Sequence, residues 1–156
     1  MAEIIISASE TVQAPPSVAY RILADYVDGH PHILPRPPFG ALVVESGGRG
    51  AGTVFTVQSR QGMKMITYRM SVTEPEPGRV LVETDQDPKS DLVSTFTVDA
   101  APGGHSRVTI TSRWTRAGVQ GLIERLLIAP LAVPIYRKEI ANLERLARER
   151  AGLPPL

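Results

Sequence analysis

The chain of 156 residues has a formal net charge of +1, with 42% apolar and 21% charged residues and no cysteine. This balance argues against nucleic-acid binding driven by charge, and the missing thiols exclude disulfides and cysteine-bound zinc. The length accommodates one domain, residues 1–156, with its own core. Residues 1–13 lack the basic start of a leader, and no stretch approaches about 18 uninterrupted apolar residues, so we expect a cytoplasmic protein without a membrane span.

The N-terminal part predicts a strand, a short helix and a structured loop. The run Ile4–Val12 is strand-like, and Pro15 and Pro16 then open a helix because proline suits a first helical turn. The stretch Asp28–Pro38 contains four prolines, which exclude a central strand and any regular helix longer than one turn. We therefore expect this stretch to be a loop at the surface.

Six further strand-like runs follow, separated by short segments rich in glycine and proline. Short connections join neighbouring strands as hairpins, so the pattern predicts an antiparallel meander. With the first run, they make a sheet of about seven strands. The six predicted strands are Phe39–Ser46, Thr53–Arg60, Met63–Thr73, Arg79–Asp85, Asp91–Asp99 and Arg107–Arg116.

The last predicted element is one long helix, Val119–Arg150. Apolar residues recur along it at spacings of four and three, which places them in one continuous stripe. Pro130 and Pro134 each remove an amide donor, so we expect a bend at this point. The stripe consists of Leu122, Leu126, Ala129, Val133, Tyr136, Ile140, Leu143 and Ala147.

A second apolar row lies beside this stripe and makes the apolar surface of the helix unusually broad. Its members are Ile123, Leu127, Leu131 and Ile135. Two explanations stay open for the N-terminal half of the helix. Either the Pro-rich loop covers it, or it makes the contact of a homodimer.

Three local motifs resemble those of the START-like, or SRPBCC, superfamily, specifically its polyketide cyclase/dehydrase and lipid-transport group. Thr11–Tyr20 is similar to the passage from first strand to first helix, Gly50–Thr53 to the turn before the third strand, and Thr73–Arg79 to the central turn. The resemblance spans nearly the whole chain and implies the α+β helix-grip fold, a curved antiparallel sheet wrapped around a long C-terminal helix. These motifs are structural, so they specify a fold and not an activity.

The helix-grip fold implies a ligand cavity between the sheet and the terminal helix. Strand alternation directs Tyr68 of one strand and Val80, Val82 and Thr84 of another toward this space. We expect the cavity to open beside Tyr26–Leu34. The expected ligand-binding residues are Tyr26, His30, Phe55, Tyr68, Val82, Ser94, Phe96, Ser112, Trp114 and Tyr136.

No cofactor or metal is predicted. His30 and His32 are two residues apart, but two ligands are too few for a metal site, and their Pro-rich loop favours exposure or the rim of the cavity. Candidates for proton transfer are present without a partner fixed by the sequence, so catalysis and the catalytic residues stay open. These candidates are Tyr68, Tyr26, His30, Asp25 and Glu10, and the orientation of Glu10 is also open.

Three functions agree with these observations. The first is the binding of a small hydrophobic or aromatic molecule, such as a lipid, a polyketide or a quinone-like compound. The second is an enzyme, a polyketide aromatase/cyclase or dehydratase that uses acid–base catalysis. The third is a protein-interaction or co-chaperone module that uses the exposed side of the terminal helix. The resemblance implies the range of ligands, because members of the superfamily bind such molecules and only some are enzymes.

Overall fold

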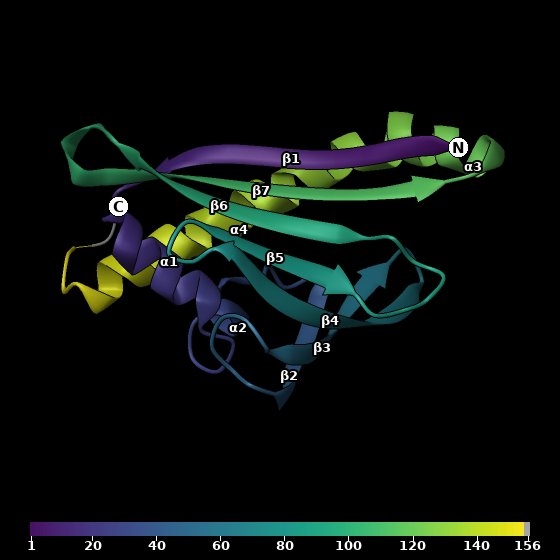
Figure 1. Ribbon diagram of the computed structural model, residues 1–156. Helices are drawn as coiled ribbons and strands as arrows, with labels where there is room; N and C mark the ends of the chain where they lie inside the picture. Colours follow the sequence, from purple (N-terminus) through teal and green to yellow (C-terminus); the bar gives the residue numbers. More distant parts are fainter. Residues whose placement is uncertain (155–156) are drawn as a thin grey trace.

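One seven-stranded antiparallel sheet, ordered β1-β7-β6-β5-β4-β3-β2, forms the frame of the computed structural model, which describes residues 1–154 (Figure 1). Each pair of consecutive strands from β2 to β7 forms a hairpin, and β1 pairs with β7 from Ala2↔Arg116 to Val12↔Ser106. The predicted meander is confirmed. The strands are β1 (Ala2–Val12), β2 (Phe39–Ser46), β3 (Val54–Gln61), β4 (Lys64–Glu76), β5 (Val80–Asp85), β6 (Val93–Ala101) and β7 (His105–Arg116).

The helices lie on the inner side of the curved sheet, and the long C-terminal helix runs along it (Figure 1). The arrangement is the predicted helix-grip fold. The helical elements are α1 (Pro16–Ala24), α2 (His30–Ile33), the short turn η1 (Pro102–Gly104), α3 (Gly118–Ile123), η2 (Glu124–Ile128) and α4 (Ala129–Arg150).

The main core lies at the end of the sheet where α1, α2 and the C-terminal half of α4 meet. Ile140, Leu143 and Ala147 of α4 are buried there, together with Leu23 of α1 and Ile33 of α2. A smaller cluster lies at the other end, where Ile4 and Ile6 of β1 contact Ala129. The two ends of the inner space are therefore packed to different extents.

The terminal helix is continuous but irregular. A π-helical turn, η2, separates α3 from α4, and the amide of Ala129 donates to the carbonyl of Glu124, five residues earlier. The next residue, Pro130, has no amide hydrogen to continue the regular ladder. The π turn lies just before Pro130, and the bend expected at Pro130 and Pro134 stays a prediction.

The predicted apolar stripe is correct from Ala129 onward and wrong before it. Leu122 and Leu126 are 53% and 60% exposed, because the start of the helix lies beside the edge strand β1 and beyond the main core (Figure 1). The Pro-rich loop does not cover this part. It forms α2 on the opposite half of the helix, where Asn142 Nδ2 donates to the carbonyl of Ile33 at 3.0 Å.

The inward side of β5 was predicted incorrectly. Leu81 and Glu83 are buried, whereas Val80, Val82 and Thr84 lie on the outer side. The pairing fixes this orientation, because Glu83 lies opposite Ser94 of β6, which faces inward. The prediction failed because a carboxylate occupies an inner position while two valines occupy outer ones.

The one-sided packing of the helix is testable with two matched leucine substitutions. Leu143 is fully buried and Leu131 is 73% exposed. We expect Leu143→Ala to lower the free energy of unfolding by about 2–5 kcal/mol, since it leaves a cavity in the core. Leu131→Ala should change it by less than about 0.5 kcal/mol. Urea unfolding of both variants measures the difference, and equal losses would contradict the packing described here.

Candidate functional site

Nine of the ten residues predicted to bind a ligand lie on the inner side of the fold, and they form two groups. The deep group, Tyr26, His30, Phe55 and Phe96, is fully buried. The outer group consists of Tyr68, Ser94, Ser112, Trp114 and Tyr136, and all of these except Ser112 are half-buried. The tenth residue, Val82, lies on the outer side of β5. Ligand contact by these residues stays a prediction.

His30 lies in the core and not on a surface loop as predicted. Its side chain is 2% exposed, and its Nδ1 donates to the carbonyl of Leu23 at 2.8 Å. The preceding residue must be small, because a Cβ on Gly29 would lie 2.4 Å from the carbonyl oxygen of Ile22. Gly29 thus allows the loop to fold tightly against α1 and to direct the imidazole inward.

Two buried glutamates face this imidazole. His30 Nε2 lies 3.6 Å from Glu83 Oε1 of β5 and 3.8 Å from Glu139 Oε1 of α4. Tyr26 donates from its hydroxyl to the same Oε1 of Glu83 at 2.6 Å. Among the described residues, Glu139 Oε1 is the one buried side-chain polar atom without a hydrogen-bond partner. We call Tyr26, His30, Glu83 and Glu139 the buried acid cluster.

Aromatic rings enclose the buried acid cluster and exclude water from it. The ring of Tyr26 stacks on His30 and on Phe55, with centroid distances of 4.7 and 4.8 Å. Phe96 meets His30 edge-on at 5.3 Å. Such contacts fix the imidazole plane and lower the local dielectric, which strengthens every electrostatic interaction within the cluster.

Burial dominates the protonation of the two carboxyl groups. It raises the pKa of Glu139 well above its usual range, and the neighbouring Glu83 raises that pKa further. Burial also raises the pKa of Glu83, although His30 and the hydrogen bond from Tyr26 act in the opposite direction. In a dry core beside a single imidazole, ionising both carboxyl groups has a high free-energy cost, because two buried negative charges would lie close together. The arrangement therefore holds Glu139 as a neutral acid near the Glu83–His30 pair.

Neither glutamate was singled out from the sequence. Glu139 directly precedes the stripe residue Ile140, so the helical pattern places its side chain beside the apolar stripe and not within it. Glu83 alternates with Leu81, and a correct assignment of β5 would have placed it inside. The sequence feature that could have revealed Glu83 is its position two residues after Leu81, which places both side chains on the same face of the strand.

The outer group forms a row of hydroxyl groups on the half-buried part of the inner face. Tyr136 donates to Ser112 Oγ, and Ser112 shares a hydrogen bond of 2.6 Å with Ser94. Beside this row, Trp114 donates from Nε1 to Glu124 Oε2 at 3.0 Å. The hydroxyl of Tyr68 accepts from Gln61 Nε2 at 2.6 Å. Apolar rings and exchangeable hydroxyls thus lie together, which is a usual composition for a small-molecule site.

Two hollows are prominent at the surface, and neither lies over the predicted entrance at Tyr26–Leu34, where most residues are buried. A hollow of about 320 Å³ lies between residues 66–69 of β4 and the segment Asp85–Pro88, and Tyr68 is the member of the outer group that lines it. Its lining takes residues from both faces of β4, Ile66 and Tyr68 from the inner side and Thr67 and Arg69 from the outer side. The predicted opening beside Tyr26–Leu34 is closed by α2.

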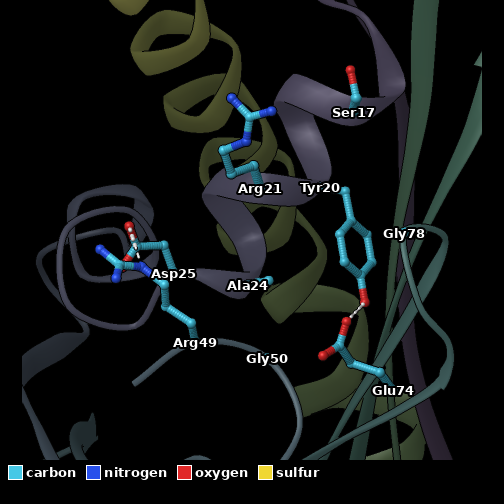
Figure 2. A pocket seen from close by; sticks show the side chains of 9 residues that line it. All are labelled: Ser17, Tyr20, Arg21, Ala24, Asp25, Arg49, Gly50, Glu74 and Gly78. Atoms are coloured by element: carbon cyan, nitrogen blue, oxygen red, sulfur yellow. Dashed lines mark hydrogen bonds and ion pairs between the residues drawn. The ribbon is translucent and has the colours of Figure 1, made fainter. Parts of the chain in front are cut away.

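The larger hollow, of about 590 Å³, is an open groove between α1, the 49–50 turn and the connection between β4 and β5 (Figure 2). Tyr20 points across it and donates to Glu74 Oε2 at 2.6 Å. Arg49 Nε lies 3.7 Å from Asp25 Oδ2. These four groups pair with one another, whereas Ser17 and Arg21 line the groove without a side-chain partner among residues 1–154.

The remaining candidates lie away from the inner space. His32 is exposed with its Nε2 3.8 Å from Asp28, so it does not converge with His30. Glu10 shares the inward parity of β1 but is exposed, and its Oε1 lies 3.5 Å from Arg137 of α4. No group of three or more potential metal ligands occurs among residues 1–154.

Comparison with known proteins gives concordant matches. The sequence profile of the family described as "Polyketide cyclase / dehydrase and lipid transport" matches residues 3–148. No curated protein matches the sequence significantly. The fold is similar to the solution structure of KanY protein, with 26% identity, a TM-score of 0.79 and coverage of 95% of this chain and 99% of that one.

Two crystal structures are similar in fold at lower identity. A protein of Thermus thermophilus has 18% identity and a TM-score of 0.76, with 94% of this chain and 99% of that chain covered. The Zhui aromatase/cyclase of a Streptomyces species has 16% identity and a TM-score of 0.75, with 96% of each chain covered.

The buried acid cluster predicts a pH-dependent stability. The folded pKa of Glu139 is raised above its unfolded value of about 4.3, so the folded state binds more protons and loses stability as the pH rises. Glu139→Gln keeps the shape and cannot ionise. As the pH rises through the titration window, we expect the free energy of unfolding of this variant to increase relative to that of the wild type, by up to about 1.4 kcal/mol for each unit of pH.

Urea unfolding between about pH 5 and pH 8 measures this effect. Glu149→Gln, an exposed substitution on the same helix, serves as the control and should follow the wild type. A difference between Glu139→Gln and the wild type that does not change with pH would contradict the protonation described.

Proposed function

Because the chain belongs to the polyketide cyclase/dehydrase and lipid-transport family, we propose that it binds a small apolar or aromatic molecule on the inner face of the sheet. The site is the outer group, where the inner side of the sheet is less buried than at the deep group. The proposal is supported by the contrast between the two ends of the fold: Phe55 and Phe96 are fully buried, whereas Tyr68, Trp114 and Tyr136 are half-buried.

The hydroxyl row is the single observation that carries this proposal. The hydroxyl groups of Ser94, Ser112 and Tyr136 hydrogen-bond to one another within apolar walls. A hydroxyl can donate or accept, so the row can exchange one of its internal bonds for a bond to a ligand oxygen at little cost. A flat molecule with apolar surface and one or two oxygens fits this chemistry better than a purely aliphatic chain.

The hollow beside Tyr68 supplies the route of access. Two of its lining residues, Ile66 and Tyr68, lie on the inner side of β4. The hydroxyl of Tyr68 accepts a hydrogen bond from the side chain of Gln61, and its partly buried ring packs at the margin of the core. A ligand that entered here would meet Tyr68 first and the hydroxyl row next.

The chain's single tryptophan makes this proposal directly measurable. Trp114 belongs to the outer group, so a bound aromatic compound such as a hydroxynaphthoquinone should quench its fluorescence in a saturable manner. Tyr68→Ala should weaken binding by about tenfold, because a large aromatic contact is lost. Val82→Ala, on the outer side of the sheet, should leave binding unchanged. Equal affinities for both variants, or quenching that does not saturate, would refute the site.

A second function, acid–base catalysis of cyclisation with loss of water, is favoured by the buried acid cluster. Loss of water needs one proton donated to the leaving hydroxyl and one removed from the adjacent carbon, with a carbon–carbon double bond formed between them. A neutral Glu139 and the imidazole of His30 are a suitable acid and base. The cluster is closed to solvent, so a substrate reaches it only if α2 or α4 moves; binding is therefore proposed first.

Mass spectrometry can separate these two functions. An aromatic poly-β-ketone thioester incubated with the protein should lose water faster than in buffer if the cluster is catalytic. Glu139→Gln should then abolish the acceleration while the quenching of Trp114 persists. Binding without acceleration would leave the chain as a carrier, and acceleration that survives in Glu139→Gln would exclude the cluster.

A further inference from the structure

The first half of the terminal helix exposes apolar side chains that the inner site does not use. Their exposed fractions range from 46% to 73%, and none belongs to the outer group or to the buried acid cluster. A contiguous surface of this kind marks an interaction site in a soluble fold. We call it the apolar segment, and its members are Leu122, Ile123, Leu126, Leu127, Ile128 and Leu131.

The apolar segment is exposed on more than one side of the helix. Leu126, Leu127 and Ile128 follow one another in the π turn η2, so their side chains point in different directions around the helix axis, and each is at least half exposed. Only a narrow side of the helix faces the sheet, where a Cβ on Gly121 would lie 2.3 Å from the carbonyl oxygen of Arg116 at the end of β7 and 3.3 Å from the Cβ of Ala2 at the start of β1. A partner must therefore surround much of the helix, and a flat protein surface covers only one side.

The charges around the apolar segment are of one sign. Between residues 117 and 138 the only acidic residue is Glu124, and it turns away to accept from Trp114 and to pair with Arg116. Arg125 and Lys138 have no ion-pair partner within residues 1–154. A symmetric contact between two copies would bring two Arg125 side chains into one apolar interface. Neither apolar segment has an exposed acidic side chain that could pair with them.

The helix could lie on a bilayer but not cross it in this fold. By length and composition, Gly118–Arg150 is a candidate membrane span, and 11% of its most apolar 18-residue window is buried. Its C-terminal half, however, carries Ile140 and Leu143 into the core. The start of the helix is held along β1 by Ala129, which packs on Ile4 and Ile6.

We propose that the apolar segment docks the protein on the surface of an anionic lipid bilayer. The leucines and isoleucines enter the boundary between headgroups and acyl chains, and Arg125 and Lys138 contact the lipid phosphates and carboxylates. Lipid surrounds a helix on several sides, as the exposure of three consecutive residues requires. The proposal does not depend on a ligand in the inner site.

Co-sedimentation with vesicles tests this docking. The protein should bind vesicles of phosphatidylcholine mixed with phosphatidylserine, and bind pure phosphatidylcholine several-fold more weakly. Leu127→Asp should reduce binding by about tenfold or more, since an apolar anchor is replaced by a like charge. Val43→Asp is the matched control, because Val43 is also exposed, at 56%, but lies on β2; this variant should bind as the wild type does.

A charge variant separates lipid docking from apolar adhesion. Arg125→Glu should abolish the preference for phosphatidylserine while circular dichroism shows an unchanged melting curve. Absence of vesicle binding by the wild type would overturn the proposal, as would equal losses in Leu127→Asp and Val43→Asp. A wild-type dimer in light scattering that Leu127→Asp dissociates would overturn it too, because a second copy would then cover the segment.

Discussion

Packing of the C-terminal half of α4 against α1, α2 and the sheet is the contact on which the rest of the structure depends. Leu143 and Ile140 are almost completely buried in this contact, and the side chain of Asn142 donates a hydrogen bond to the carbonyl of Ile33. Because a long helix is anchored at one end, its other end follows the edge strand β1 and stays largely uncovered. The asymmetry leaves a dense core at one end and a half-open inner face at the other.

The dense end holds a group of charges that a purely apolar core would not need. Replacing a buried ionic group by well-packed apolar residues is often neutral or stabilising. A contribution to stability is therefore not a sufficient reason for burying Glu83 and Glu139. Glu139 in particular has a buried oxygen without a partner. Unpaired buried acids concentrate at functional sites, because proton transfer requires a shifted pKa. This observation is the ground on which the cluster is proposed as the acid–base centre of the second candidate function.

The fold could be predicted from the sequence because its signals are repetitive. Six alternating runs with short connections predict a meander, and the spacing from Ala129 to Ala147 predicts a buried helical stripe. The inner positions of β3, β4, β6 and β7, such as Phe55, Met70, Phe96 and Ile110, follow from alternation alone. Local periodicity suffices wherever apolar residues occupy the inner positions.

The candidate site was predicted less well, because its distinctive residues break those patterns. Glu83 occupies an inner position that alternation assigns to an apolar residue, so the prediction placed Val82 inside instead. His30 is carried inward by the tight contact of Gly29 with α1, which depends on tertiary packing and leaves no periodic signal. Leu122 and Leu126 fit the helical stripe, but this part of the helix lies beside the edge strand of the sheet, which leaves both side chains uncovered.

The most direct test of the central claim, ligand binding at the outer group, is to map amide chemical shifts during titration with an apolar aromatic compound. We expect saturable changes centred on Tyr68, Ser94, Trp114 and Tyr136, with little change around the α1 groove at Tyr20 and Arg49. Changes concentrated in that groove, or no saturable change on the inner face, would contradict the account.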